Sequence, residues 1–488
     1  MAPNLNRRDF LKSLSAGAAV AGLAGCARSV RGMPPRGSKE TPHGVTTNKP
    51  NIIFILADDL GYGDLGCYGQ KLIETPAIDQ MAAEGMRFTD HYAGSTVCAP
   101  SRCCLMTGLH TGHATIRGNS EVHPMGQLPL PADTVTLPRM LQQAGYKTAL
   151  IGKWGLGGPG SAGEPNQQGF DYFFGYLCQR HAHNHYPEFL FRNSERIPLK
   201  NKVPGGREDG AGVATEKVEY SYDLMEQEAL QFVTDNKEGP FFLYLAVTLP
   251  HANNEAGKSG MEVPDYGIYE GKDWPQAEKG RAAMISRLDR GVGRLLRRVK
   301  NLGIDENTLV FFSSDNGPHR EGGSDPNFFA GSGPLRGIKR DLYEGGIRVP
   351  LIARWPGQIE AGALAAHVSA FWDFLPTCAA LAGAEAPETT DGLSLVPTLL
   401  GSARKQEQHE FLYWEFHERG SAQAVRFGRW KAICLPSGSL ELYDLANDLG
   451  ETTDVAAGHP EEIAKARAYL ARARTESEFW PLKRVPGA

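Results

Sequence analysis

The chain has 488 residues, of which 41% are hydrophobic, and its 51 basic and 56 acidic residues give a formal net charge of −5. This charge excludes a generally basic surface, so no nucleic-acid partner is expected and any anionic ligand must be bound by a local cluster. The eight cysteines are too few for a disulfide framework and form no C-x-x-C pair. The length allows one large domain and a smaller one.

Residues 1–45 have the composition of an export signal followed by a tether, and we leave them out of the predicted fold. Arg7 and Arg8 precede a weakly apolar run that is too short to span a membrane and ends in LAGC at 23–26. This order is typical of a bacterial twin-arginine (Tat) signal with a lipoprotein cleavage box. It predicts export by the Tat machinery to the periplasm or cell surface, with a lipid anchor at Cys26 as the only membrane attachment. The alternative is an ordinary secretion signal that is cut nearby.

Residues 46–400 alternate between strand and helix patterns and are predicted to form one large domain. The first strand is predicted over 50–59, where a short apolar run ends in an acidic pair. The first helix is predicted over 75–85, with Thr75 as its cap and Pro76 in its first turn. The later elements are helix 134–146, strand 147–152, helix 223–236, strand 240–247, helix 281–303 and strand 308–315. This alternation predicts an α/β fold, with a mostly parallel central sheet and helices on both faces.

The pattern changes after about residue 400. Short alternating strands are predicted over 411–416, 423–433 and 439–445, and a polar helix over 460–480. We therefore expect residues 401–488 to form a small C-terminal subdomain in which an antiparallel sheet packs on a helix.

Polar residues follow the predicted strands of the large domain, where ligands bind in open α/β sheets. They are Asp58 and Asp59, Lys153, His251, and Asp315 and Asn316. Three carboxylates and an amide carbonyl at one edge would form an oxygen cage suited to Ca²⁺ or Mg²⁺ rather than Zn²⁺. Each acidic pair taken alone is equally consistent with a turn.

The stretch STVCAPSRCCLMTG at 95–108 predicts an anion site. A helix can follow Cys98 because Pro100 is tolerated in a first turn. Cys98 would then lie at the positive end of the helix, with Arg102 one turn further on. Cys103 and Cys104 fall on the same helix and are expected in the core.

These residues resemble the signature of the formylglycine-dependent (type I, arylsulfatase-like) sulfatases of the alkaline phosphatase superfamily. The similarity continues over most of residues 50–400, in blocks that follow the order of the family. The blocks are ADD at 57–59, CAPSRCCLMTG at 98–108, GKW at 152–154, LPH at 249–251, DNG at 315–317 and GIKRDLYEGGIRVP at 337–350. The resemblance implies a sulfatase fold and makes residues 46–400 the catalytic domain.

The resemblance also implies roles for individual residues. A maturation enzyme would convert Cys98 to formylglycine, whose hydrate attacks sulfur through one hydroxyl and expels sulfate through the other. The metal ligands would be Asp58, Asp59, the modified Cys98, Asp315 and Asn316, around Ca²⁺ or alternatively Mg²⁺. Arg102 would hold the aldehyde hydrate, Lys153 and Lys339 would bracket the sulfate, and His251 would protonate the departing alcohol together with Lys339.

One position departs from the family pattern. Many relatives have a histidine where this chain has Gly155. The segment CQRHAHNHYP at 178–187 offers three histidines, and we expect His183 to take the vacant place. The competing interpretations are that these histidines contact substrate hydroxyls or only cover a loop.

The polar loops and the predicted export favour a sulfated sugar as the substrate. His185, Asn253 and Asn254 are the predicted substrate-binding residues, because sugar hydroxyls need paired donors and acceptors. Their segments also look similar to those of bacterial sulfatases that act on polysaccharide fragments. Two alternatives remain: a phosphomonoester or phosphonate ester hydrolase of the same superfamily, and an inactive lipoprotein that binds sulfated glycans. The chain lacks the additional ligands of a two-zinc site, which argues against the former.

Overall fold

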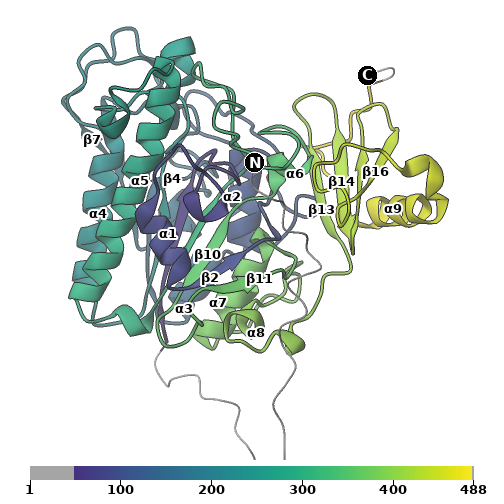
Figure 1. Ribbon diagram of the computed structural model, residues 1–488. Helices are drawn as coiled ribbons and strands as arrows, with labels where there is room; N and C mark the ends of the chain where they lie inside the picture. Colours follow the sequence, from purple (N-terminus) through teal and green to yellow (C-terminus); the bar gives the residue numbers. More distant parts are fainter. Residues whose placement is uncertain (1–48, 486–488) are drawn as a thin grey trace, which may run out of the picture. The chain divides into compact units, whose positions relative to one another are not determined.

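The computed structural model describes residues 49–485 (Figure 1). The predicted export signal, the tether and Cys26 lie outside these residues. Within the described part, no helix is long and apolar enough to cross a membrane. The chain folds around a ten-stranded sheet, and it also contains a separate sheet of four strands and a pair of two-residue strands, β3 (His91–Tyr92) and β12 (Ser369–Ala370).

The large sheet is mostly parallel at its centre. In spatial order its strands are β11 (Ala363–Ala365), β2 (Met86–Phe88), β10 (Leu351–Arg354), β9 (Thr308–Ser314), β1 (Asn51–Ala57), β8 (Phe241–Ala246), β4 (Lys147–Lys153), β5 (Tyr172–Tyr176), β6 (Phe189–Arg192) and β7 (Glu195–Pro198). The pairs from β9 to β5 are parallel, whereas β10 and β6 join their neighbours antiparallel. The prediction of a mostly parallel sheet is confirmed. The sequence analysis did not predict β2, β5, β6, β7, β10 and β11, which are three to five residues long.

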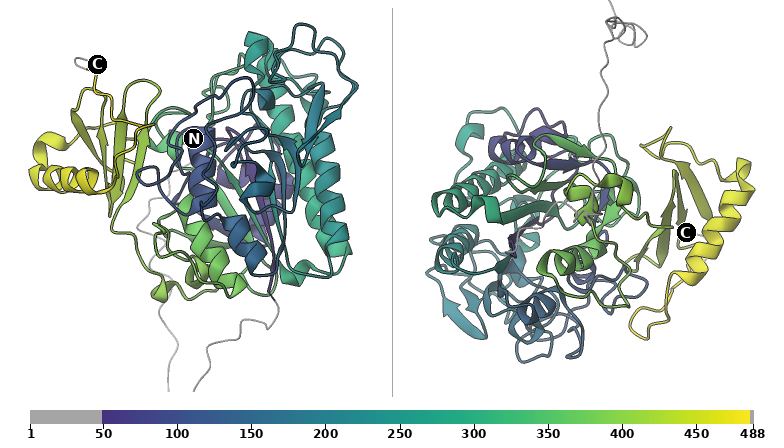
Figure 2. Two further views of the ribbon diagram at one scale, coloured as in Figure 1. Left: turned by 180° about the vertical axis from the view of Figure 1, so that it is seen from behind. Right: turned by 90° about the horizontal axis from the view of Figure 1, so that it is seen from below.

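Helices cover both faces of this sheet (Figure 2). One face packs against α1 (Pro76–Ala83), α4 (Ser221–Asp235) and α5 (Gln276–Asn301), and the other against α2 (Cys98–Thr107), α3 (Leu137–Gln143) and α7 (Phe374–Ala382). Side chains of β1 alternate between two cores: Ile53 lies with the first group of helices and Phe54 with the second. The short helices α6 (Glu344–Ile347) and α8 (Val396–Leu399) lie in the connections after β9.

The C-terminal sheet is antiparallel in the order β13 (Leu412–Phe416), β14 (Ala422–Phe427), β15 (Trp430–Cys434) and β16 (Leu440–Asp444). One face packs on α9 (Pro460–Arg472), as predicted (Figure 1). The expected extent of that helix to residue 480 is wrong. After Arg472 the chain leaves the helix, and the Thr475 amide donates a hydrogen bond to the carbonyl of Gly112.

Candidate active site

The predicted ligand residues meet at the carboxyl ends of neighbouring parallel strands. Asp58 and Asp59 follow β1, Asp315 and Asn316 follow β9, and Lys153 ends β4. All five side chains are buried. Because β9, β1, β8 and β4 are adjacent in the sheet, residues separated by up to 257 positions come into hydrogen-bonding contact.

The acidic residues and the asparagine form one connected cluster. The backbone amide of Asp59 donates to Oδ1 of Asp315 at 3.0 Å, and Nδ2 of Asn316 donates to Oδ1 of Asp59 at 2.7 Å. Asp59 has a φ of 65°, which a non-glycine residue adopts at a cost of about 1 kcal/mol or more. The buried Oδ1 of Asn316 has no hydrogen-bond partner among the described residues. This cluster therefore offers several oxygen atoms that a hard cation such as Ca²⁺ prefers.

Three cations offset the charge of the three buried carboxylates. Lys153 Nζ lies 2.7 Å from Oδ2 of Asp58, and Lys339 Nζ lies 2.7 Å from Oδ2 of Asp59. Arg102 donates two hydrogen bonds to Oδ2 of Asp315, at 3.1 and 2.8 Å. Although burial opposes ionisation, the cations hold the pKa of Asp58 and of Asp59 below its usual range. Burial and the negative Asp58 raise the pKa of Asp315 to about 7.

Cys98 is the first residue of α2 and is 3% exposed. Its Sγ lies 3.3 Å from Oδ1 of Asp58. Burial, Asp315 and Asp58 raise the pKa of the thiol well above its usual value. An unmodified Cys98 is therefore a neutral thiol, and a neutral thiol is a weak nucleophile.

His251 faces the same cluster from the loop after β8. Its Nδ1 donates to the carbonyl of Ala252 at 2.7 Å, because a carbonyl oxygen can only accept. Its Nε2 accepts a hydrogen bond from Lys339 Nζ at 3.1 Å. Burial and the neighbouring Lys339 charge lower the pKa of His251 well below its usual value, so the ring is neutral.

Comparisons with known proteins identify the family of this chain. A sequence model described as "Sulfatase" matches residues 50–384, and one described as "N-sulphoglucosamine sulphohydrolase, C-terminal" matches residues 338–473. The chain belongs to the sulfatase family. It is thus a sulfuric ester hydrolase of the alkaline phosphatase-like superfamily, as the motifs predicted. A twin-arginine translocation signal model matches residues 4–24, which supports export.

The similarity to individual sulfatases extends over most of the chain. Human arylsulfatase A is 35% identical over 472 residues, which cover 86% of this chain and 87% of the human protein. Rat N-acetylgalactosamine-6-sulfatase is 35% identical over 411 residues, which cover 78% of this chain and 71% of the relative. The solved structure of Ps i-CgsB in complex with k-i-k-neocarrahexaose has a TM-score of 0.74 and 28% identity, and the match covers 89% of this chain and 95% of that one.

His183 and His185, the two histidines predicted to contribute to this sulfatase site, lie in different surroundings. His183 lies in the 3₁₀ helix η3 (His181–His183), and its ring stacks on His251 with centroids 4.9 Å apart. Its Nδ1 is 3.2 Å from a carboxylate oxygen of Glu255. His185 is buried, and its Nε2 donates to the carbonyl of His251 at 2.8 Å. His183 therefore borders the site, whereas His185 lies behind it.

The two predicted asparagines also differ. Asn253 is fully buried, and its Nδ2 donates to the carbonyl of Gly212 at 3.0 Å and to Glu262 at 2.8 Å. Asn254 is exposed. These contacts favour a supporting role for Asn253 in the loop, and they leave Asn254 accessible to a ligand.

The sequence analysis missed three residues near the site. His319 stacks on His251 with centroids 5.9 Å apart, and Glu321 lies 3.3 Å from Lys339 Nζ. Both residues follow the DNG motif within a few positions. Their place just after a predicted strand could have identified them as candidate site residues. The third residue, Gln179, lies against Gly155, and no pattern in the sequence indicates that contact.

Proposed function

We propose that this sulfatase hydrolyses sulfate esters of sulfated carbohydrates, with a formylglycine made from Cys98 as its nucleophile. The main support for this proposal is the position of Cys98 at the start of α2, with its Sγ 3.3 Å from Asp58 Oδ1. Arg102 and Lys153 extend into the same cluster. The rat relative is named for a sulfated amino sugar, and the Ps i-CgsB structure contains k-i-k-neocarrahexaose, which supports a carbohydrate substrate.

The environment of residue 98 favours a modified side chain. The high pKa of the buried thiol leaves it protonated, so it offers little nucleophilic reactivity as cysteine. A hydrated aldehyde would supply two hydroxyls, one to attack sulfur and one to release the sulfate. Arg102 would hold this hydrate, since its guanidinium is itself held by Asp315 and by the carbonyl of Lys153 at 2.7 Å. A maturation enzyme in the host would have to make the aldehyde.

A divalent cation fits the oxygen cluster. Asp58, Asp59, Asp315 and Asn316 would hold Ca²⁺, with Mg²⁺ as the alternative, and the unpartnered Oδ1 of Asn316 supports this. The cation would supply positive charge to the sulfate oxygens and lower the pKa of the nucleophile. Lys153 and Lys339 neutralise these carboxylates in the structure, and they would bracket the sulfate as point charges.

Lys339 and His251 would together protonate the departing alcohol. Their shared hydrogen bond places one proton between Nζ and Nε2. A bound sulfate ester would add negative charge beside His251 and raise its pKa, which favours the protonated ring that a general acid needs. His183 stacks on His251 with centroids 4.9 Å apart, which supports the proposal that His183 would assist the release of sulfate.

We propose that Tat export delivers the protein to the periplasm or cell surface, where a lipid on Cys26 would anchor it.

Mass spectrometry of the peptide containing Cys98 tests the proposed nucleophile: conversion of the thiol to the aldehyde lowers the mass by about 18 Da. The purified protein should release nitrophenol from 4-nitrophenyl sulfate far faster than from 4-nitrophenyl phosphate. An active protein with an unmodified thiol at Cys98 would refute the proposal, and binding of sulfated glycan without turnover would favour the inactive lipoprotein.

A further inference from the structure

A hollow adjoins the catalytic cluster, which is the group of side chains around Asp58, Asp59 and His251. The hollow has a volume of about 180 Å³ and is lined by His319, Arg320, Ile338, Lys339, Arg340, Asp341 and Arg419. Two of these residues connect it to the proposed reaction centre. Lys339 donates to His251, and the ring of His319 stacks on that same histidine. A ligand that extends from the catalytic cluster past Lys339 would therefore enter this hollow.

Three arginines reach this hollow from two parts of the chain. Arg320 and Arg340 lie in the loop that joins β9 to α6, and Arg419 lies in the turn between β13 and β14. The C-terminal sheet thus contributes directly to the surroundings of the catalytic cluster. Such convergence of guanidinium groups is suited to an anionic group with two or more oxygens, such as a carboxylate or a sulfate, because each guanidinium can donate two parallel hydrogen bonds.

The central arginine is held in place by protein carboxylates. Arg340 has a φ of 76°, and its side chain bonds to Glu321 at 2.6 Å and to Glu418 at 3.0 Å. Glu418 in turn accepts a hydrogen bond from Asn119, whose Oδ1 accepts from the amide of Ala99. A chain of polar contacts therefore connects Ala99, the residue after Cys98, to Arg340.

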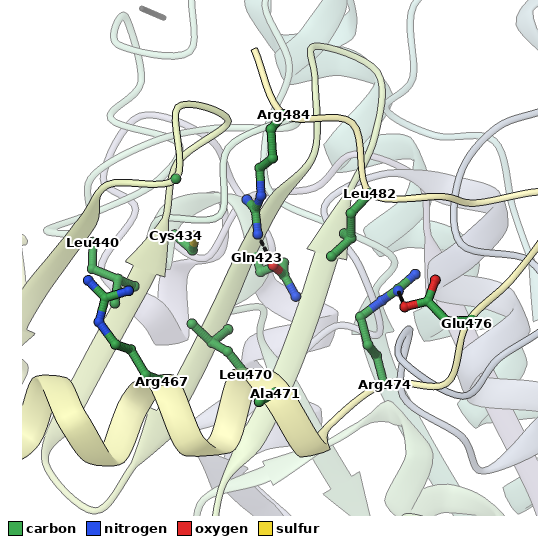
Figure 3. Close-up of a pocket in the computed structure, with 11 residues that line it drawn as sticks. Gln423, Cys434, Leu440, Arg467, Leu470, Ala471, Arg474, Glu476, Leu482 and Arg484 are labelled. Atoms are coloured by element: carbon green, nitrogen blue, oxygen red, sulfur yellow. Dashed lines mark hydrogen bonds and ion pairs between the residues drawn. The ribbon is translucent and has the colours of Figure 1, made fainter. Parts of the chain in front are cut away.

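The other two arginines have no such partners. Arg320 and Arg419 are exposed, and neither forms a side-chain hydrogen bond or an ion pair with any residue from 49 to 485. A larger hollow of about 470 Å³ on the C-terminal sheet is also lined by three arginines (Figure 3). There Arg484 bonds to Gln423 and Arg474 bonds to Glu476, which leaves only Arg467 without a partner among the described residues.

We infer that Arg320 and Arg419, arranged around Arg340, form a subsite for a second anionic group of the substrate. The inference rests on the proposed sulfatase activity toward carbohydrates and narrows its substrate class. The preferred substrate carries a second sulfate or a carboxylate near the sulfate ester that is cleaved. The exposed position of both arginines makes their contribution sensitive to salt.

The test compares matched saccharides on the mature, full-length protein. One saccharide carries a single sulfate ester, the second carries an additional sulfate, and the third carries a uronic acid. Each is measured as a substrate and as a competitor of 4-nitrophenyl sulfate hydrolysis, so that an uncleaved saccharide still reports its affinity. The second and third saccharides distinguish a sulfate from a carboxylate as the recognised group.

The wild-type protein should prefer at least one of the two doubly charged saccharides. In the double variant R320Q/R419Q the preference should fall by about tenfold, chiefly through KM or the inhibition constant. The matched control is R404Q, which removes another exposed arginine from the short 3₁₀ helix η8 (Ala403–Lys405). This control should keep the wild-type preference.

Two results would overturn the inference. The wild-type protein could treat all three saccharides alike, or R320Q/R419Q could keep the full preference. Failure of the proposed function has a different signature, because the wild-type protein with formylglycine at Cys98 would then cleave no sulfate ester in the panel and no 4-nitrophenyl sulfate. Thermal melting of each variant separates loss of recognition from loss of folding.

Discussion

The side-chain amide of Gln179 lies against Gly155, at the point where a side chain on residue 155 would begin. A Cβ on Gly155 would meet Nε2 of Gln179 at 1.8 Å, and Gly155 has a φ of +81°. Nε2 of Gln179 is buried without a hydrogen-bond partner in the described residues. The space beside Gly155, where the family resemblance leads us to expect a histidine, is therefore filled by a side chain from another segment of the chain.

The contact between Gly155 and Gln179 predicts that a histidine at position 155 would destabilise the fold. Gly155→His should lower the free energy of unfolding by about 2–3 kcal/mol, chiefly from backbone strain at positive φ and in smaller part from displacement of the Gln179 side-chain amide. The double variant Gly155→His/Gln179→Ala should recover only the smaller part, about 1 kcal/mol, and not the strain. Urea denaturation measures both. Equal destabilisation in the single and double variants would show that Gln179 is not the obstacle.

Substitution of Cys98 should separate activity from folding. Cys98→Ala should lower hydrolysis of 4-nitrophenyl sulfate by more than about 10³-fold, because it removes the proposed nucleophile. The side chain is small, so the melting temperature should change little. Cys103→Ala is the matched control, since Cys103 is buried on the same helix and lies outside the cluster. Comparable loss of activity in this control would contradict the assignment.

Asp315→Asn should weaken the binding of a divalent cation by at least about tenfold. The substitution keeps the size of the side chain but removes the carboxylate that Asp315 would offer to a cation beside Asp58 and Arg102. The measurement is the Ca²⁺ dependence of the melting temperature after treatment with a chelator, because a ligand of the folded state stabilises it. Asp133→Asn, at an exposed position, serves as the control. An unchanged Ca²⁺ dependence in Asp315→Asn would rule out this residue as a ligand.

The role of His183 can be resolved by two substitutions. His183→Ala removes both the stacking on His251 and the contact with Glu255, whereas His183→Phe keeps an aromatic ring. If the imidazole transfers a proton, kcat should fall about 10²-fold in both variants. If the ring only supports His251, His183→Phe should retain most of the activity. An unchanged kcat in His183→Ala would exclude His183 as the replacement for the missing histidine.

His181 predicts a particular pH dependence of stability. Burial lowers its pKa to about 3, whereas an unfolded histidine has a pKa near 6.5. Between these values only the unfolded state binds the proton, so stability falls as pH falls below about 6.5 and the loss levels off near pH 3.

His181→Leu removes this proton uptake and tests it directly. The loss of unfolding free energy between pH 7 and pH 5 should be about 2 kcal/mol smaller in the variant than in the wild-type protein. Urea denaturation at both pH values provides the comparison. An identical loss in the two proteins would mean that His181 is protonated in the folded state or accessible to solvent.

The sequence by itself determined the central parallel strands of the large sheet, several of its helices, and which of these strands end in polar residues. Apolar runs, helix caps and turn residues act between near neighbours, so strands β1, β4, β8 and β9 were recognisable. The motif around Cys98 and the acidic pairs at strand ends also lie within short segments. The sulfatase family followed from them, together with the expectation that the acidic residues gather at one edge of the sheet. Helix ends were less accurate, because contacts with distant residues such as Gly112 decide them.

Only the tertiary structure decided how these segments meet. The order β9-β1-β8-β4 brings Asp315 beside Asp59, and no local pattern specifies which strands become neighbours. The same holds for Gln179 against Gly155 and for Arg419 of the C-terminal sheet beside Lys339. These contacts join residues far apart in the chain, and their energy depends on burial, packing and charge that exist only once the whole core has formed.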